Sequence, residues 1–416
     1  MSVVTFTEAR RIVEEHARRQ KPGDTEMAPL LEARRRVLAT EMVADRDFPP
    51  FPRSTRDGYA VRATDLSRLP LRLEVIGEIK AGASSEVISR NVQPGQAVEI
   101  MTGAPVPPGA DAVLMVEHAA REGGFIIPAR GVASGENIVP QGAEARAGER
   151  LLAPGTRLDP AALAVAASIG QSEIPVYRRP RVAILATGDE LVEISARPEP
   201  SQIRNSNSYS LAAQTAEAGA EPIILPVARD EAGPLREAIT RGLPADLLLL
   251  TGGVSMGKYD LVEQVLAQLQ AEFYFTGALI QPGRPVVFGG LPRAREGAIR
   301  RPQLFFGLPG NPVSTMVTFD LFVDPVIAAL SGAVVKPLVF LQAKLKSELR
   351  SKTGLTRFLP AVLGGEFENA EVEAVRWQGS GDVAATARAN CYLVVPPDRE
   401  CISAGELIGV LVRWSH

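Results

Sequence analysis

The stretch Asp246-Leu-Leu-Leu-Leu-Thr-Gly-Gly-Val-Ser-Met-Gly-Lys-Tyr-Asp260 decides the fold that we predict. Its four consecutive leucines indicate a strand that is buried on both faces, as in a parallel sheet. Gly252 and Gly253 then allow successive backbone N–H groups to turn to one side and bind an anion. A helical pattern follows from Tyr259 to Leu269. A loop of this kind predicts phosphate and a carboxylate-bound Mg²⁺ as ligands, because ligands bind at the carboxyl ends of parallel strands. The alternative is a purely structural turn in which Asp260 caps the helix.

Strand and helix patterns alternate on both sides of this stretch. The predicted strands are 181–185, 222–227, 246–250, 273–276, 285–288 and 304–306. The predicted helices are 208–218, 233–241, 259–269 and a last one that ends near residue 330. This alternation predicts a doubly wound, mostly parallel α/β sheet.

Carboxylates occur where three of these strands end. Glu190 follows the first strand, Asp230 the second and Asp260 the third. These positions share one edge of a doubly wound sheet, so the three carboxylates are our candidate catalytic and metal-binding residues. A preference of acidic residues for helix N-termini explains each position singly. It explains less easily why all three lie beside two glycine-rich loops.

The rest of the chain predicts further parts. Thr5-Phe-Thr-Glu8 matches a capping box that begins a helix, and a second helix is expected from about Pro29 to Ala44. The proline-rich segment 48–62 predicts either a domain crossing or a ligand-facing loop. Short strands between 71 and 130, punctuated by glycine and proline, indicate a small barrel or sandwich. The last predicted strands are 337–341, 371–377, 391–395 and 407–412, which together indicate a C-terminal β-domain.

Composition narrows the function classes. A chain of 416 residues is expected to form several domains, and its net charge of −3 does not favour nucleic-acid binding. Two cysteines and three histidines argue against a disulfide framework, a zinc site or a histidine-based metal centre. We recognise no signal peptide and no apolar run near 18 residues, so we expect a cytoplasmic protein that does not span a membrane.

Seven motifs occur along the chain in a fixed order. They are Arg56-Asp-Gly-Tyr-Ala-Val-Arg62, Ile100-Met-Thr-Gly-Ala-Pro-Val-Pro107, Gly135-Glu-Asn-Ile138, Thr187-Gly-Asp-Glu-Leu191, Asn205-Ser-Asn-Ser-Tyr209, Thr251-Gly-Gly-Val-Ser-Met-Gly257 with Asp260, and Gly307-Leu-Pro-Gly-Asn-Pro312. Each motif is weak alone. Their order and spacing resemble the MoeA family of molybdopterin molybdenumtransferases, to which the E-domain of gephyrin is related. The resemblance covers essentially the whole chain.

The resemblance implies a multidomain α/β and β architecture. Its parts are a partly helical N-terminal linking domain of residues 1–50 and 131–177, an inserted β-rich domain of 51–130, a molybdopterin-binding α/β domain of 178–332 and a C-terminal β-barrel of 333–416. It also implies a homodimer whose active cleft uses residues of both subunits. The expected protein partners are the molybdopterin adenylyltransferase and molybdoenzymes, without nucleic acid or membrane.

The implied reaction is the Mg²⁺-dependent insertion of molybdate into adenylylated molybdopterin with release of AMP. Asp260, Asp230 and Glu190 would then hold the metal or orient the substrate. Asp57 and Thr102 match family positions that face the cleft, and we expect them to come from the partner subunit. The predicted substrate-binding residues are Thr187, Gly188, Gly252, Gly253, Ser255, Arg284, Gly307, Pro309, Gly310, Asn311 and Pro312.

The chain departs from the family pattern where molybdate should bind. The usual Lys-Pro-Gly-Lys-Pro reads Gln281-Pro-Gly-Arg-Pro285, so one positive charge is lost and another changes geometry. The usual Gly-Arg-x-x-Phe-x-Arg reads Gly354-Leu-Thr-Arg-Phe-Leu-Pro360, and a common serine is Ala385. Arg357 and Arg388 are candidate substitutes for the displaced arginines. The choice between molybdate and tungstate stays open.

Two other functions remain as alternatives. The displaced arginines favour a non-catalytic molybdopterin carrier or scaffold, whereas the retained carboxylates favour the enzyme. A nucleotide-pyrophosphate hydrolase could use a related α/β domain. The family-like N-terminal half, which includes Asp57 and Thr102, argues against that hydrolase.

Overall fold

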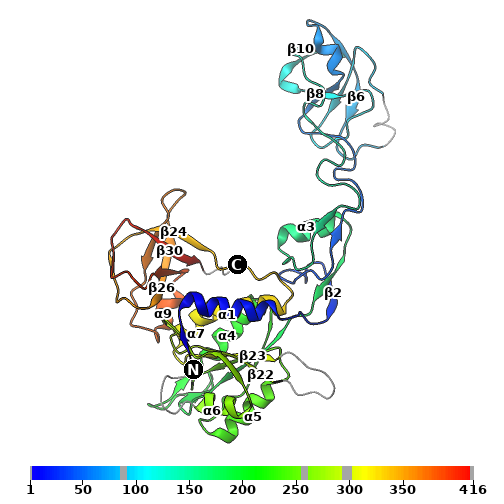
Figure 1. Cartoon of the computed structure of the whole chain (residues 1–416). Coiled ribbons are helices and arrows are strands. Elements are labelled where there is room, and N and C mark those ends of the chain that lie inside the picture. The colour runs from blue at the N-terminus through cyan, green and yellow to red at the C-terminus, as the bar shows by residue number, and fades with distance from the viewer. Residues whose placement is uncertain (1, 85–90, 254–260, 293–301, 413–416) are drawn as a thin grey trace. The chain divides into compact units, whose positions relative to one another are not determined.

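The computed structural model describes residues 2–84, 91–253, 261–292 and 302–412. These residues form two compact units (Figure 1). Unit 1 comprises Met1–Ala39, Gly155–Asp159 and Glu173–His416, and unit 2 comprises Thr40–Pro154 and Pro160–Ser172. Two predicted site residues, Ser255 and Asp260, lie outside the described residues.

A six-stranded sheet forms the centre of unit 1. Its order is β17-β14-β18-β23-β22-β19. The strands are β14 (Arg181–Ala186), β17 (Glu221–Ile224), β18 (Leu247–Thr251), β19 (Glu272–Phe275), β22 (Val287–Leu291) and β23 (Gln303–Leu308). The first four strands in this order pair in parallel, and β22 and β19 pair antiparallel at one side. The prediction of a mostly parallel α/β sheet is therefore confirmed.

Helices cover both faces of this sheet, which explains the run of four leucines. Leu247 and Leu249 pack on one face with residues of α1, α4, α7 and α8, whereas Leu248 and Leu250 pack on the other with residues of α5 and α6. The helices are α1 (Phe6–Arg18), α4 (Asn207–Glu217), α5 (Ala232–Gly242), α6 (Leu261–Gln268), α7 (Pro312–Thr318) and α8 (Asp324–Leu330). A strand that packs against helices on both faces of the sheet needs apolar residues at every position.

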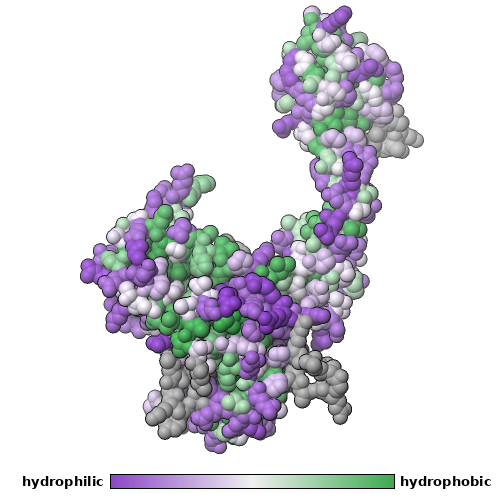
Figure 2. Space-filling model, viewed as in Figure 1, coloured by the Kyte–Doolittle hydropathy of each residue, from purple (hydrophilic) through white to green (hydrophobic). Residues whose placement is uncertain are grey.

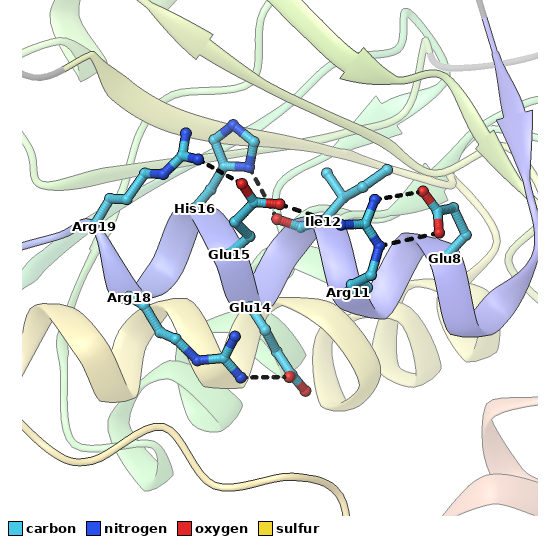
Figure 3. A network of polar contacts seen from close by, with 8 residues as sticks. All are labelled: Glu8, Arg11, Ile12, Glu14, Glu15, His16, Arg18 and Arg19. Carbon is cyan, nitrogen blue, oxygen red and sulfur yellow. Dashed lines mark hydrogen bonds and ion pairs between the residues drawn. The ribbon is translucent and has the colours of Figure 1, made fainter.

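Helix α1 begins at the predicted capping box. The hydroxyl of Thr5 accepts a hydrogen bond from the N–H of Glu8 at 3.2 Å. Exposed ion pairs follow the outer face of the helix (Figure 3), where Figure 2 shows hydrophilic residues. They join Arg11 to Glu8 and Glu15, Arg18 to Glu14, and Arg19 to Glu15. Arg10 turns inward, where it donates to the carbonyl of Leu321 and also pairs with Glu14.

The segment Pro312–Leu330 is helical throughout and forms part of the core. Helices α7 and α8 are joined by a π-helical turn, η3 (Phe319–Val323). Among the described residues it is the one segment long and apolar enough to cross a membrane, and 83% of it is buried inside the protein. The expectation that no apolar run approaches that length was wrong here. Because most of the segment is buried, core packing explains its apolar composition.

A closed β-barrel forms the C-terminal part of unit 1. Its five strands are β24 (Phe340–Leu345), β26 (Thr356–Gly364), β27 (Glu371–Ala374), β28 (Cys391–Val395) and β30 (Leu407–Val412). They follow the order β26-β27-β24-β30-β28, and β28 pairs back with β26. The short strand β21 (Ile280–Gln281) pairs in parallel with β26. The predicted C-terminal barrel is therefore confirmed.

Unit 2 contains a six-stranded sheet with the order β8-β5-β7-β6-β10-β9. Its strands are β5 (Gly58–Val61), β6 (Leu73–Ile79), β7 (Gln96–Ile100), β8 (Ala112–Met115), β9 (Ala119–Glu122) and β10 (Phe125–Pro128). Apolar side chains pack on its two sides in separate clusters. These strands fall inside the predicted insert of residues 51–130, whose boundaries stay a prediction.

Short elements complete the two units. In unit 1 they are β1 (Val3–Val4), β2 (Thr25–Pro29), β13 (Glu173–Tyr177), β15 (Leu191–Val192), β16 (Ile203–Arg204), β20 (Gly277–Ala278), β25 (Leu349–Arg350), α9 (Val383–Ala387) and β29 (Cys401–Ile402). In unit 2 they are β3 (Met42–Val43), β4 (Arg53–Ser54), η1 (Ala63–Ser67), η2 (Val116–His118), β11 (Ile138–Val139), β12 (Arg150–Leu152) and α3 (Pro160–Ser168).

The predicted helix from Pro29 to Ala44 was wrong. Turns follow β2, and Arg35 has a φ of 64°, which ends any right-handed helix. The next residues form isolated bridges instead, Val37 with Arg157 and Leu38 with Val176. These distant partners bury both apolar side chains, so tertiary contacts override the local helical pattern.

Candidate active site

Thr187 lies where β14 ends and connects two neighbouring strand ends. Its hydroxyl donates to a carboxylate oxygen of Asp230 at 2.5 Å. Its backbone N–H donates to the carbonyl of Thr251, at the end of β18, at 3.0 Å. Thr187 is only 2% exposed, whereas Asp230 is exposed. The buried threonine therefore fixes one oxygen of an accessible carboxylate at the carboxyl edge of the sheet.

Glu190 lies beside the same turn. A Cβ atom at Gly188 would stand 2.6 Å from one carboxylate oxygen of Glu190, so the side chain folds back over this glycine. Asp189 accepts a hydrogen bond from the N–H of Asp230 at 3.3 Å. Both carboxylates thus contact the Thr187–Gly188 turn, Glu190 beside Gly188 and Asp230 through the hydroxyl of Thr187.

The first glycine-rich loop contacts this turn directly. Gly252 and Gly253 have φ angles of 89° and 63°, which favour glycine. A Cβ atom at Gly252 would stand 2.2 Å from the carbonyl oxygen of Thr187, so no other residue fits there without moving the backbone. This close approach keeps the ends of β14 and β18 together.

Asn207, at the beginning of α4, joins the first glycine-rich loop to the second. Its side-chain amide donates to the hydroxyl of Thr251 at 3.0 Å and to the carbonyl of Gly310 at 2.7 Å. Thr251 in turn donates to the carbonyl of Pro309 at 3.3 Å. The buried oxygen of the Asn207 amide has no hydrogen-bond partner among the described residues. Sequence reasoning quoted the motif around Asn207 but did not propose it as a site residue.

The remaining predicted site residues lie in β23, at the beginning of α7 and in the loop after β21. Gly307 lies inside β23, where it pairs with Leu250 and Val287. Asn311 immediately precedes α7, and Pro312 is its first residue. Arg284 is exposed and follows Gly283, at which a Cβ atom would meet the side chain of Thr318 at 2.4 Å. The Gln281–Arg284 loop therefore packs against α7.

The fit of a Mg²⁺ ion can be tested on the donor atoms. Carboxylate oxygens such as those of Asp230 and Glu190 are the ligands that Mg²⁺ prefers, and it commonly uses one or two of them together with substrate phosphates. Among the described residues no group of three His, Cys, Asp or Glu side chains gathers around one point. The donor set present thus suits a Mg²⁺ ion that is shared with a phosphate ligand rather than a metal bound by protein alone.

Unit 2 holds the other two predicted catalytic residues in direct contact. One carboxylate oxygen of Asp57 accepts from the backbone N–H of Thr102 at 2.6 Å and from its hydroxyl at 2.7 Å. These two hydrogen bonds lower the pKa of Asp57, the backbone bond more than the hydroxyl. Asp57 is therefore fully ionised at neutral pH, although its side chain is exposed.

The residues that depart from the family pattern lie in the barrel and in β21. Gln281 pairs with Arg357 across β21 and β26, so an arginine neighbours the position of the missing lysine. The Arg357 guanidinium donates to the carbonyl of Lys352 at 2.9 Å. Ala385 is buried in α9, and Arg388 follows that helix. Of the two candidate substitutes, the pairing favours Arg357.

Comparisons with known proteins give matches along nearly the whole chain. The MoeA N-terminal region (domains I and II) matches residues 4–170, a probable molybdopterin-binding domain matches 183–329, and the MoeA C-terminal region (domain IV) matches 342–412. A protein named molybdopterin molybdenumtransferase from Bacillus subtilis is 36% identical over 94% of this chain and 91% of its own length. A protein of the same name from Nostoc is 37% identical over 93% of this chain and 88% of its own length.

A solved structure is similar to this chain over nearly the full length of both. The molybdopterin biosynthesis MoeA protein from Pyrococcus horikoshii is similar to this chain with a TM-score of 0.78 and 32% identity, covering 99% of this chain and 100% of that one. The three matched regions and the relatives that cover almost all of the sequence lead to one conclusion. This chain belongs to the MoeA family.

Proposed function

We propose that this chain is a molybdopterin molybdenumtransferase of molybdenum cofactor biosynthesis, which inserts molybdate into adenylylated molybdopterin and releases AMP with the help of Mg²⁺. The observation that carries the proposal is the meeting of two accessible carboxylates and two glycine-rich loops at one edge of the α/β sheet. The relatives that bear this enzyme name support the activity.

The glycine-rich loops suit the phosphates of the substrate. Positive φ angles at Gly252 and Gly253 turn backbone N–H groups to one side, and such groups bind phosphate oxygens. Asn207 holds this loop against Gly310 and presents a buried amide oxygen without a partner, which can accept a hydrogen bond from an N–H or O–H of the substrate. These groups bind and orient the substrate.

Asp230 and Glu190 would hold the Mg²⁺ ion next to the phosphates. When bound, the ion neutralises phosphate charge and makes the phosphoanhydride easier to cleave. Thr187 keeps Asp230 ready for this role, since it occupies one carboxylate oxygen and leaves the other free for the metal. Asp260 belongs to the same proposed set through its place in the sequence.

Molybdate is a dianion and needs cationic or N–H donors. Arg284 supplies an exposed guanidinium beside α7, and Arg357 stands next to the uncharged Gln281. We propose that these two arginines attract the oxyanion in place of the usual lysines. Tungstate has the same charge and shape, so both oxyanions belong in the test.

The assembly is part of the proposal. Asp57 and Thr102 would complete the cleft of a partner subunit in a homodimer. The protein would act in the cytoplasm, receive its substrate from the adenylyltransferase and supply molybdoenzymes.

The test is an anaerobic assay of AMP release from adenylylated molybdopterin with Mg²⁺ and either molybdate or tungstate. We expect oxyanion-dependent release by the wild type and a loss of at least about 100-fold in Asp230→Asn and Glu190→Gln, since each substitution removes a metal ligand. The matched control is Glu237→Gln, an exposed carboxylate on α5 that pairs with Arg241. Tight substrate binding without release under either oxyanion would instead establish a carrier.

A further inference from the structure

A polar cavity lies at the end of the central sheet opposite to the glycine-rich loops. It has a volume of about 370 Å³ and is lined by residues of unit 1 alone, among them Lys21, Arg178, Arg179 and Arg181. Arg181 is the first residue of β14, whereas Thr187 of the candidate active site follows its last. Six strand residues separate the two places by about 20 Å. The cavity is therefore distinct from the glycine-rich loops.

Positive charge dominates this cavity. Four cationic side chains line it against two carboxylates, Asp24 and Asp246. Asp246 already accepts a hydrogen bond from the backbone N–H of Arg181 at 2.8 Å, so one of its oxygens is occupied. In the described part of the chain, no hydrogen bond or ion pair holds the charged groups of Lys21, Arg178, Arg179 or Arg181. An anion would find several donors that are not engaged elsewhere.

Arg179 is a cavity arginine whose guanidinium has no hydrogen-bond or ion-pair partner among the described residues. Burial is the largest cause of the lowered pKa of this arginine, and the positive charge of Arg36 lowers it further, whereas the charges of Glu26 and Glu221 raise it. Arg36 is itself paired with Glu26 and the carbonyl of Tyr177, so it has partners that Arg179 lacks. A bound anion would give the Arg179 guanidinium the direct partner that it lacks.

The adjacent end of α1 does not oppose an anion strongly. Gln20 lines the cavity, and its backbone N–H donates to the carbonyl of Ala17 at 2.9 Å. Its side-chain amide donates to the carbonyl of His16 at 3.3 Å. These bonds cover carbonyl groups at the negative end of the helix dipole.

We infer that this cavity is a binding site for a small phosphate-bearing molecule. Arginine guanidinium groups bind phosphate through paired N–H donors, and lysine adds a further positive charge. The volume lies within the range of about 300–1,000 Å³ that is typical of small-molecule sites, which favours a metabolite over an extended polymer. A nucleoside monophosphate and free phosphate share this chemistry, so both serve as probes.

The test measures binding of AMP and of inorganic phosphate by calorimetry, with hydrogen–deuterium exchange to locate each ligand. The variant is Arg178→Gln/Arg179→Gln in the full chain. The matched control is Arg241→Gln/Arg350→Gln, which changes two exposed arginines that pair with Glu237 and Glu348 outside the cavity. Circular dichroism and thermal melting verify that each variant is folded.

We expect saturable binding and slower exchange in residues 20–24 and 178–181 of the wild type and of the control. The Arg178→Gln/Arg179→Gln protein should lose at least about tenfold in affinity and lose that protection, because two charge-assisted contacts are removed. Tighter binding of AMP than of phosphate would identify a nucleotide site, and equal binding a phosphate site. Undiminished affinity in this variant, or protection confined to 187–190 and 251–253, would overturn the inference.

Discussion

Asp57 shows how two local donors set the charge of an exposed carboxylate. The N–H and the hydroxyl of Thr102 bind the same oxygen and lower its pKa below the ordinary value of 3.8. A group whose pKa is lower in the folded state contributes stability above its unfolded pKa, and that stability is lost as the pH falls through the folded pKa. The contribution is therefore complete at neutral pH and disappears only in acid below 3.8.

Thr102→Val should raise the pKa of Asp57, because it removes the hydroxyl donor and leaves the backbone N–H. The value should remain below 3.8, since the backbone bond is the larger cause of the shift. A carbon-13 NMR titration of the Asp57 carboxyl measures this change. Thr64→Val serves as the control, because Thr64 lies elsewhere in unit 2. An unchanged pKa would contradict the assignment of the hydroxyl.

Asn207→Ala should weaken both the loops and the activity. It removes two hydrogen bonds, to Thr251 and to Gly310, each of which contributes about 1 kcal/mol. We expect a thermal midpoint lower by a few degrees and a kcat/KM at least about tenfold lower, because a loop displaced by about 1 Å no longer orients the substrate. Gln264→Ala on the exposed face of α6 is the control. Full activity in Asn207→Ala would show that the loops hold their positions without it.

Helix α1 carries one buried arginine, Arg10, next to arginines that are exposed. Arg10→Ala should destabilise the packing of α1 by about 2–3 kcal/mol, since it leaves the carbonyl of Leu321 without its donor inside the core and removes a mostly buried ion pair with Glu14. Arg11→Ala should cost less than about 0.5 kcal/mol, because its ion pairs with Glu8 and Glu15 are exposed. Hydrogen exchange of the α1 amides compares the two. Equal effects would mean that the buried contacts of Arg10 are unimportant for stability.

The elements that the sequence predicts well are those with strong local signals. Thr5 caps α1 as its capping box indicates, and β28 and β30 match the predicted ranges. The longest barrel strand, β26, was missed because Pro360 lies inside it, and proline usually argues against a strand interior. The turns after β2 were mistaken for a helix, since their bridges to residues 157 and 176 are invisible locally.

The part of the candidate site that follows from sheet topology was predictable from the sequence. Glu190 and Asp230 lie together because both follow strands of one parallel sheet, and the sequence shows both the strands and the carboxylates. The role of Asn207 was not predictable, because its partners Thr251 and Gly310 are 44 and 103 residues away in the chain. The pairing of Gln281 with Arg357 likewise exists only through β21 and β26.

In the proposed homodimer, each active site is divided between two chains. If Asp57 of one subunit serves the loops of the other, Asp57→Ala and Asp230→Ala proteins should each be inactive alone. After mixing and reassociation they should recover about one quarter of wild-type AMP release, because half of the dimers carry one intact site. Heterodimers that form without any recovery would contradict a shared cleft.

A single anaerobic turnover in which AMP and molybdenum are both counted measures the proposed molybdenum insertion itself. Wild-type protein is mixed with one equivalent of adenylylated molybdopterin, Mg²⁺ and excess molybdate, and the pterin product is analysed for bound metal. We expect one molybdenum in the pterin for each AMP released by the wild type. The Asp230→Asn protein should neither release AMP nor insert molybdenum. AMP release without metal in the pterin would contradict the proposed insertion and indicate a nucleotide-pyrophosphate hydrolase.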